Sequence, residues 1–409
     1  MSACEFFVCG SVIVFVFFEH SSVDPCFDTY LIEFNQSTIT TRKHTLHKKS
    51  ASSFISSPFS TSMNVINTIS SLRRSNLRFA RQCKCKCQNL STIQMPVYHH
   101  SDYTLNLPDL HTFPMSRYNL VRKGIQAQAQ KYGISIKSPI PSTIKQVSLA
   151  HDLEYINKFT KGELNPMEVR TLGFPWSYDL VRRTYRITGA TVQCVTDVCN
   201  DGFNVSGNLA GGTHHAFAGH AEGYCIFNDV AVAARVAQQE YQVGRCLVID
   251  LDVHQGNGTA EIFTNDDSVF TWSVHGDKNY PWKSRVPSDL DTPLPDDITG
   301  EEYLEKVEAG LDQLTHMVND FDLIFYQAGV DPLASDRLGR LQLTREDLQA
   351  RNALVYSWCN AYNKKTVVTM GGGYSKPIEN SVECHVDVFT QAASMLSENT
   401  SPCFARRRG

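Results

Sequence analysis

Two aspartates and a histidine follow a short apolar run with a spacing that suits metal binding. Residues 250–258 read D-L-D-V-H-Q-G-N-G and come directly after the apolar residues 246–249. On an extended chain, side chains two residues apart project to the same face, so Asp252 and His254 can hold one ion while Asp250 lies behind them. Carboxylates and imidazoles are common zinc ligands. Acidic residues at strand ends also cap helices and line loops, so this segment alone leaves both interpretations open.

Three further segments carry groups of the same kind. Residues 211–215 read G-G-T-H-H, which presents two adjacent imidazoles from a glycine-containing loop. An apolar run at 323–326 leads to Asp331, and another begins at 367 and ends in G-G-G-Y at Tyr374. Because open parallel sheets place functional groups outside the carboxyl ends of their strands, we expect the four segments to meet in one crevice. Taken singly, a histidine pair is more often structural, and G-G-G-Y can be a flexible or phosphate-binding loop.

The order of these motifs resembles the zinc-dependent histone deacetylase family. G-G-T-H-H, E-G-Y-C-I-F-N-D, D-L-D-V-H-Q-G-N-G, A-G-V-D and G-G-G-Y follow one another in the family's order between residues 96 and 396. Residues 97–99 and 113–118 also match how such domains begin, and the sequence is most similar to the class IV branch and to bacterial deacetylase-like proteins. The resemblance implies an α/β domain of the arginase/deacetylase type, with a parallel sheet and helices on both faces. It also implies hydrolysis of N6-acyl-lysine amides in proteins such as histones.

The resemblance makes Asp252, His254 and Asp331 the ligands of one catalytic Zn²⁺ ion, with open positions for a water and the substrate carbonyl. Three protein ligands are the usual number in a catalytic zinc site. Because two carboxylates make a harder ligand set than imidazoles alone, Fe²⁺ and Co²⁺ are alternatives. A structural K⁺ ion is implied near the backbone of Asp250, with Ser273 as a contributor.

The histidine pair is implied as the proton-transfer machinery. His215 is the general base and His214 its hydrogen-bonding partner, which suits imidazole because its ordinary pKa is about 6.5. Asp250 matches the residue behind His214, and Asn257 matches the residue behind His215, where many family members carry aspartate. A neutral amide stabilises imidazolium less than a carboxylate does, so we expect His215 to be mostly neutral. Which histidine transfers most of the proton stays open.

Substrate-binding residues follow from the same resemblance. Tyr374 is expected to donate to the oxygen that becomes negative, and loss of one such donor costs on the order of 10²- to 10³-fold in rate. Gly223 and Tyr224 match the walls of a narrow acyl-lysine tunnel, with Tyr280 as the opposing wall. Residues 172–176 read L-G-F-P-W and lack the aspartate that clamps the substrate backbone in many relatives. The length of the acyl chain and the recognition of a histone-like peptide therefore stay open.

The first 95 residues differ in composition from the rest of the chain. Residues 34–101 hold no Asp or Glu, but ten Lys or Arg and twenty Ser or Thr. This composition predicts a disordered transit peptide at residues 1–95, with a basic amphipathic helix from Met63, and a location in the chloroplast or mitochondrion. A basic tail or a misassigned start codon, with a nuclear or cytoplasmic location, is the alternative. Residues 96–396 then form the catalytic domain and 397–409 a tail.

Composition also limits the functional classes. From Asp102 onward the chain holds 28 basic and 37 acidic residues, so we expect no direct nucleic-acid binding and a preference for basic, lysine-bearing partners. No apolar run reaches 18 residues, so no membrane span is predicted. The 13 cysteines show no regular pairing and are interpreted as reduced thiols.

Two alternatives remain: a hydrolase of small amides such as acetylpolyamines, and a metal-binding scaffold without turnover. Co-repressor and oligomer partners are not predicted.

Overall fold

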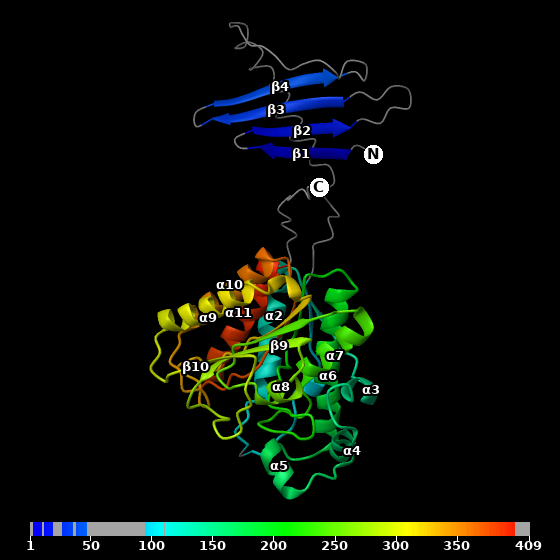
Figure 1. Cartoon of the computed structure of the whole chain (residues 1–409), viewed down its shortest axis with the longest axis vertical. Coiled ribbons are helices and arrows are strands. Elements are labelled where there is room, and N and C mark those ends of the chain that lie inside the picture. The colour runs from blue at the N-terminus through cyan, green and yellow to red at the C-terminus, as the bar shows by residue number, and fades with distance from the viewer. Residues whose placement is uncertain are drawn as a thin grey trace. The chain divides into compact units, whose positions relative to one another are not determined.

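The computed structural model describes residues 3–9, 12–18, 27–35, 38–46, 95–109 and 111–396. The chain divides into two units, residues 1–88 and 89–409 (Figure 1). In the first unit, four strands pair antiparallel in chain order: β1 (Ala3–Cys9), β2 (Val12–Phe18), β3 (Phe27–Asn35) and β4 (Thr38–Leu46). Sequence analysis did not predict these strands, although β-branched and aromatic residues dominate β2. The predicted helix from Met63 and the tail at 397–409 lie outside the described residues.

An eight-stranded parallel sheet forms the centre of the second unit. Its strand order is β10-β9-β8-β11-β12-β7-β5-β6, and every neighbouring pair is parallel. The strands are β5 (Met95–Tyr98), β6 (Ile134–Lys137), β7 (Val205–Asn208), β8 (Cys246–Asp250), β9 (Val269–Gly276), β10 (Leu290–Leu294), β11 (Leu323–Gln327) and β12 (Lys365–Thr369). The predicted α/β class is confirmed.

Three of the apolar runs in the sequence become adjacent central strands. β8 and β11 are buried along their whole length, and β12 is buried in all but its first residue. Strands covered on both faces need continuous apolar sequences, which explains why these runs show no alternation. Because β8, β11, β12 and β7 are neighbours, the loops at their carboxyl ends meet at one edge of the sheet.

Helices cover both faces of this sheet (Figure 1). On one side, α2 (Ser116–Tyr132), α9 (Gly300–Thr315), α10 (Arg345–Ala361) and α11 (Ile378–Leu396) pack in a chain of contacts. On the other side, α6 (Tyr178–Cys199) packs on α7 (Asp229–Tyr241) and on β5, β7 and β12. Shorter helices lie in the connections: α3 (Ile144–Val147), α4 (Leu153–Lys161), α5 (Pro166–Leu172) and α8 (Asn257–Ile262), with 3₁₀ turns at Ser101–Tyr103 and Val318–Asp320.

Apolar residues at helical spacing in the sequence predict helices over residues 226–239 and 301–318, and both helices are present with shifted ends. The helix expected over residues 226–239 is α7, which begins at Asp229 because the side chain of Asn228 accepts a hydrogen bond from the amide of Ala231. The helix expected over 301–318 is α9, which ends at Thr315 and is followed by the 3₁₀ turn. Helix ends depend on such local hydrogen bonds, which apolar periodicity does not report.

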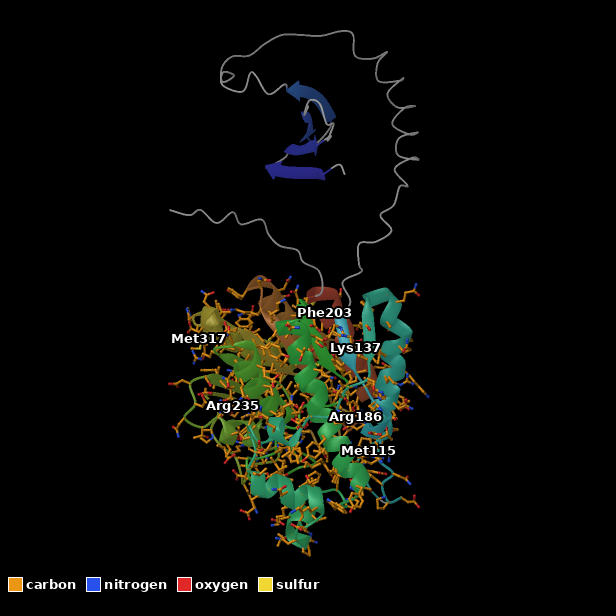
Figure 2. The ribbon with its side chains drawn as sticks, turned by 90° about the vertical axis from the view of Figure 1, so that its right-hand side faces the viewer. Met115, Lys137, Arg186, Phe203, Arg235 and Met317 are labelled. Carbon is orange, nitrogen blue, oxygen red and sulfur yellow. The ribbon has the colours of Figure 1, made fainter. Side chains whose placement is uncertain are left out.

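The edge of the sheet is fixed by one long side chain. Lys137, the last residue of β6, pairs with Asp197 of α6 at 3.1 Å, and its ammonium lies 5.3 Å from the ring centre of Phe203 (Figure 2). These contacts tie the edge strand to α6 and to the segment that leads into β7. Among the described helices, none combines the length and apolar character that crossing a bilayer requires.

Candidate metal centre and active site

Asp252, His254 and Asp331 come together as a buried group. Asp252 and His254 follow the end of β8, and Asp331 follows the neighbouring β11. His254 Nδ1 lies 2.9 Å from Asp252 Oδ1 and 3.0 Å from Asp331 Oδ2. One donor atom from each residue lies within 4.8 Å of the other two. The structure therefore brings together the three residues that the sequence analysis named as ligands.

The hydrogen bonds around the two carboxylates leave one oxygen free for an ion. Asp252 Oδ2 accepts from the amide of Gly372 at 2.7 Å, and Asp331 Oδ1 accepts from the amide of Val253 at 2.9 Å. Asp331 Oδ2 is buried, and apart from the His254 imidazole at 3.0 Å it accepts no hydrogen bond from any residue that the structure describes. A buried charged oxygen is stable only when it is paired or coordinates a metal. The separations of about 3 Å between His254 Nδ1 and one oxygen of each carboxylate also suit an ion held at about 2.0–2.2 Å from each donor, so the group fits a divalent cation.

The pKa of Asp331 is raised because its carboxyl group is buried close to Asp252. Burial and the nearby Asp252 raise this pKa to about 7. Glycines make the close approach possible, because a Cβ on Gly372 would overlap Asp331 Oδ2 and a Cβ on Gly329 would overlap Asp252 Oδ2. The glycines of the A-G-V-D and G-G-G-Y motifs thus have a steric role beside these two carboxylates.

His214 and His215 each contact the residue predicted to lie behind them. His214 Nδ1 lies 2.6 Å from Asp250 Oδ2, and His215 Nδ1 lies 2.7 Å from Asn257 Oδ1. Both imidazoles are buried, and their ring centres are 4.1 Å apart. The ring centre of His215 is 5.8 Å from that of His254, so the pair lies directly beside the ligand group.

The two histidines have opposite pKa shifts. Burial lowers the pKa of His214, but the carboxylates of Asp250 and Asp252 outweigh burial and raise it above its ordinary value. Burial, followed by the charges of His214 and His254, holds the pKa of His215 well below its ordinary value. His215 is therefore neutral near pH 7, as predicted, although burial is the main cause and the hydrogen bond to Asn257 acts in the opposite direction. With Nδ1 donating to Asn257, its Nε2 carries a lone pair that can accept a proton.

A carboxylate that sequence analysis did not single out holds the histidine loop. Asp229, at the start of α7, accepts from the amide of Thr213 at 2.8 Å and from the amide of Gly212 at 3.2 Å. Thr191 of α6 donates to the same carboxylate at 2.5 Å. Asp229 closes the E-G-Y-C-I-F-N-D motif, so its place in the motif was the available signal.

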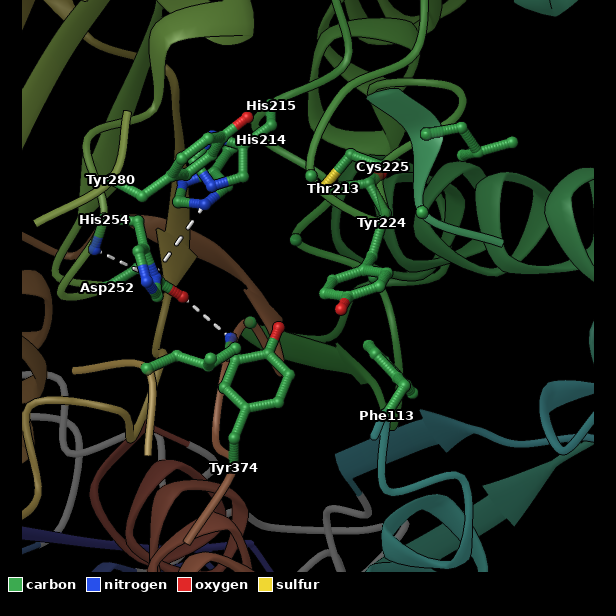
Figure 3. Close-up of a pocket in the computed structure, with 18 of the residues that line it drawn as sticks. Phe113, Thr213, His214, His215, Tyr224, Cys225, Asp252, His254, Tyr280 and Tyr374 are labelled. Carbon is green, nitrogen blue, oxygen red and sulfur yellow. Dashed lines mark hydrogen bonds and ion pairs between the residues drawn. The ribbon is translucent and has the colours of Figure 1, made fainter. Parts of the chain in front are cut away.

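Asp252 and His254 line one cavity of about 390 Å³ together with His214, His215 and Tyr374 (Figure 3). His215, His254 and Tyr280 lie on one side, Tyr224 and Phe113 face them, and the hydroxyl of Tyr374 points into the space between. The predicted tunnel residues Gly223, Tyr224 and Tyr280 all line the cavity. Gly223 has φ 55°, and a Cβ there would lie 2.8 Å from His215 Cδ2, so this position requires glycine.

Tyr374 is held from both sides. Its amide donates to Asp336 Oδ2, while Asp336 Oδ1 accepts from the amides of Leu338 and Gly339, so Asp336 both caps the loop and fixes Tyr374. The buried guanidinium of Arg117, which sequence analysis did not identify, lies 4.9 Å from the ring centre of Tyr374. Burial raises the pKa of Tyr374 well above its ordinary value, so the phenol keeps its proton.

Two further predictions concern the loop at residues 172–176 and the K⁺ site. The loop at 172–176 lies at the cavity, where Leu172 and Gly173 line it without a carboxylate. Arg170 lines the cavity beside them; it is exposed and forms no ion pair with any residue that the structure describes. The hydroxyl of Ser273 contacts His275 Nδ1 at 3.1 Å, and the K⁺ site remains a prediction.

Comparison with known proteins agrees with this geometry. The family described as histone deacetylase domain matches residues 111–389. An uncharacterized protein of Picosynechococcus sp. is 38% identical over 290 residues, which are 71% of this chain and 95% of the relative. Histone deacetylase 2 of Arabidopsis thaliana is 24% identical over 294 residues, 69% of this chain and 75% of the relative. Acetoin utilization protein AcuC of Staphylococcus xylosus is 26% identical over 282 residues, 64% and 73% of the two chains. The chain therefore belongs to the histone deacetylase family of amide hydrolases.

Proposed function

We propose that the protein hydrolyses the amide bond of N6-acyl-lysine side chains in proteins, using a zinc ion held by Asp252, His254 and Asp331. The observation that carries the proposal is that Asp252 and His254 of this buried group line one cavity with the His214–His215 pair and Tyr374. An ion bound there would polarise the amide carbonyl and lower the pKa of an attacking water.

The protonation states of the cavity residues support amide hydrolysis. His215 is neutral and its Nε2 accepts the proton of the attacking water, then returns it to the departing lysine amine. His214 donates its Nδ1 hydrogen to the Asp250 carboxylate and lies beside His215. Tyr374 keeps its phenolic proton and donates to the carbonyl oxygen as negative charge accumulates on it. Each role needs only the state that burial and neighbours already impose.

The cavity lining supports a substrate with an alkyl stem. Phe113, Tyr224 and Tyr280 supply aromatic walls, which suit the neutral methylenes of an acylated lysine. The acidic balance of the chain from Asp102 onward supports basic protein partners such as histones. One observation favours the second candidate, a small amide such as an acetylpolyamine: residues 172–176 offer no carboxylate to clamp a peptide backbone.

The composition of the amino-terminal region supports a location inside an organelle. The acid-free, Ser- and Arg-rich residues 34–101 favour import into the chloroplast or mitochondrion, with the nucleus and cytoplasm as alternatives. Mass spectrometry of the mature amino terminus from cells distinguishes them. A terminus near residue 95 supports import, and an intact Met1 contradicts it.

A substrate panel tests the proposed reaction. Full-length protein loaded with zinc is assayed on acetyl-lysine and long-chain acyl-lysine peptides and on an acetylpolyamine, beside Asp252→Ala. The proposal predicts turnover of an acyl-lysine peptide that the variant loses. Faster turnover of the acetylpolyamine would select the second candidate. Equal activity of the parent and Asp252→Ala would refute the assignment.

A further inference from the structure

Glu222 lies behind the His215–Asn257 pair, and we propose that it is a positioning residue that keeps the proton of His215 on Nδ1. This inference deepens the proposed function and rests on it. Glu222 Oε1 accepts hydrogen bonds from Asn257 Nδ2 at 3.2 Å and from Ser284 Oγ at 2.9 Å. The hydroxyl of Tyr280 donates to the same oxygen. The carboxylate thus joins the residue behind the general base to the wall of the cavity.

The partners of Asn257 fix the orientation of its side-chain amide. An asparagine can present either its oxygen or its nitrogen to a neighbour, and only its partners decide which. On the side away from His215, Asn257 Nδ2 faces two acceptors, Glu222 Oε1 and the carbonyl of Ser284, each at 3.2 Å. The reversed amide would place its oxygen against both of them. Glu222 and the Ser284 carbonyl therefore require Asn257 to present Oδ1 to His215.

The orientation of Asn257 decides the tautomer of His215. Because Asn257 Oδ1 is an acceptor 2.7 Å from His215 Nδ1, that nitrogen must carry the hydrogen. Nε2 then holds the lone pair that a general base needs. With the reversed amide, Nδ1 would face a donor and the proton would move to Nε2, which removes the base. An aspartate behind the ring would need no such help, since both of its oxygens accept.

Tyr280 and Gly223 fix the position of the imidazole ring of His215. Tyr280, whose hydroxyl Glu222 holds, packs its ring edge-on against His215 with centres 5.1 Å apart and planes at 86°. On another side, Gly223 approaches His215 so closely that a Cβ would lie 2.8 Å from Cδ2. Glu222 and Gly223 are consecutive, so one short segment fixes both the tautomer and the placement of the base.

The state of Glu222 agrees with this role. Only 8% of Glu222 is exposed. Burial raises its pKa, but hydrogen bonds from His220, Tyr280 and Ser284 outweigh burial and lower the pKa below its ordinary value. The group is therefore a charged acceptor at neutral pH. What Asn257 needs from it is an acceptor oxygen, which the amide of glutamine also provides.

The first part of the test compares two replacements. Glu222→Leu removes the acceptor and should lower kcat by roughly 10- to 100-fold, the range for residues that orient a catalytic imidazole, with little change in KM. Glu222→Gln keeps an acceptor oxygen and should recover most of that loss. Glu308→Leu, at an exposed position of α9, is the matched control for a Glu-to-Leu change. Equal activity of Glu222→Leu and this control would overturn the proposal.

The second part changes the partner. Asn257→Asp places a carboxylate next to the Glu222 carboxylate, so the two negative charges repel and activity should fall. Adding Glu222→Gln lets the glutamine turn its NH₂ toward the introduced carboxylate and should restore activity above that of Asn257→Asp alone. Additive losses in the double variant would contradict a direct link between positions 222 and 257.

The third part does not depend on turnover. Nitrogen-15 NMR of histidine-labelled full-length protein reports which ring nitrogen of His215 carries the proton, with His215→Gln to assign its signals. The parent and Glu222→Gln should show the proton on Nδ1, and Glu222→Leu should show a shift of population toward Nε2. An unchanged population in Glu222→Leu would overturn the inference. If the parent turned over none of the substrates but Glu222→Leu still showed this shift, only the proposed function would be refuted.

Discussion

The guanidinium of Arg117 lies over the ring of Tyr374, 4.9 Å from its centre, and donates to the carbonyl of Gly373 at 2.8 Å. Arg117 comes from the start of α2 and Tyr374 from the loop after β12, so the contact joins two distant parts of the chain. It fixes both the ring and the backbone beside it. Tyr374, the proposed donor to the substrate carbonyl, is thus held from outside its own loop.

This contact predicts that Arg117 acts through Tyr374. Tyr374→Phe should lower kcat on the order of 10²- to 10³-fold, because it removes one donor to the developing negative charge. Arg117→Leu should also lower kcat but add little to the loss in Tyr374→Phe, since both changes remove the same donor. Steady-state kinetics of the single and double variants measures this. Fully additive effects would show that Arg117 acts elsewhere.

Replacement of Gly372 should weaken metal binding. A Cβ at this position overlaps Asp331 Oδ2, so Gly372→Ala must displace a ligand carboxylate. Competition with a chelator should show zinc affinity reduced by at least about tenfold, the lower bound seen when the surroundings of ligands change. Gly244→Ala, whose Cβ would meet only the Asp322 carboxylate at 3.1 Å, is the control. Parent-like affinity in Gly372→Ala would mean that the carboxylate is not a ligand.

The pKa of His214 should depend on Asp250. The carboxylates of Asp250 and Asp252 raise this pKa against the effect of burial, so Asp250→Asn should lower it. Titration of the His214 ring signals by NMR, in parent and variant, measures the change. A pKa in Asp250→Asn equal to or above that of the parent would contradict the described pairing.

Stability should fall in acid because of buried neutral histidines. His151 Nδ1 contacts the carbonyl of Phe217 at 2.9 Å, and its Nε2 accepts from the amide of Asn228 at 2.8 Å, which requires the neutral ring. Burial lowers its pKa to about 4. Since the unfolded state protonates near pH 6.5 and the folded state only near 4, the free energy of unfolding should decrease between these values, by up to about 3 kcal/mol for this group.

Denaturant unfolding at several pH values tests whether the free energy of unfolding decreases in acid. The parent should lose stability as the pH falls from 6.5 to 4, and His151→Gln should show a shallower slope because one titrating group is gone. At pH 7 the variant itself should be less stable, since it loses a buried hydrogen bond. Identical slopes for parent and variant would contradict a neutral, buried His151.

The sequence was sufficient to predict the centre of the fold and the meeting of Asp252, His254 and Asp331, whereas the resemblance to the deacetylase family supplied their proposed role as ligands. Asp252 and His254 follow an apolar run that forms a buried parallel strand, and Asp331 follows another, so their meeting is a consequence of sheet topology. Spacing and strand order carry this information without tertiary detail. The prediction failed to include Arg117 and Glu222, which reach the site from α2 and from a loop. Neither lies next to a strand end.

Helix ends and the amino-terminal strands were also beyond the sequence analysis. Asn228 sets the start of α7 through one side-chain hydrogen bond, which periodicity does not detect. β1 and β2 pair through backbone hydrogen bonds between two short apolar runs. Pairing partners are a long-range property that local composition does not report.

The metal content of the purified protein tests the central claim most directly. Full-length protein and its Asp331→Asn variant are equilibrated with zinc, separated from free metal and analysed by elemental mass spectrometry, with folding checked by circular dichroism. The account predicts about one equivalent of zinc in the parent and a marked loss in the folded variant. Equal zinc in both proteins, or none in the parent, would contradict a divalent ion held by Asp252, His254 and Asp331.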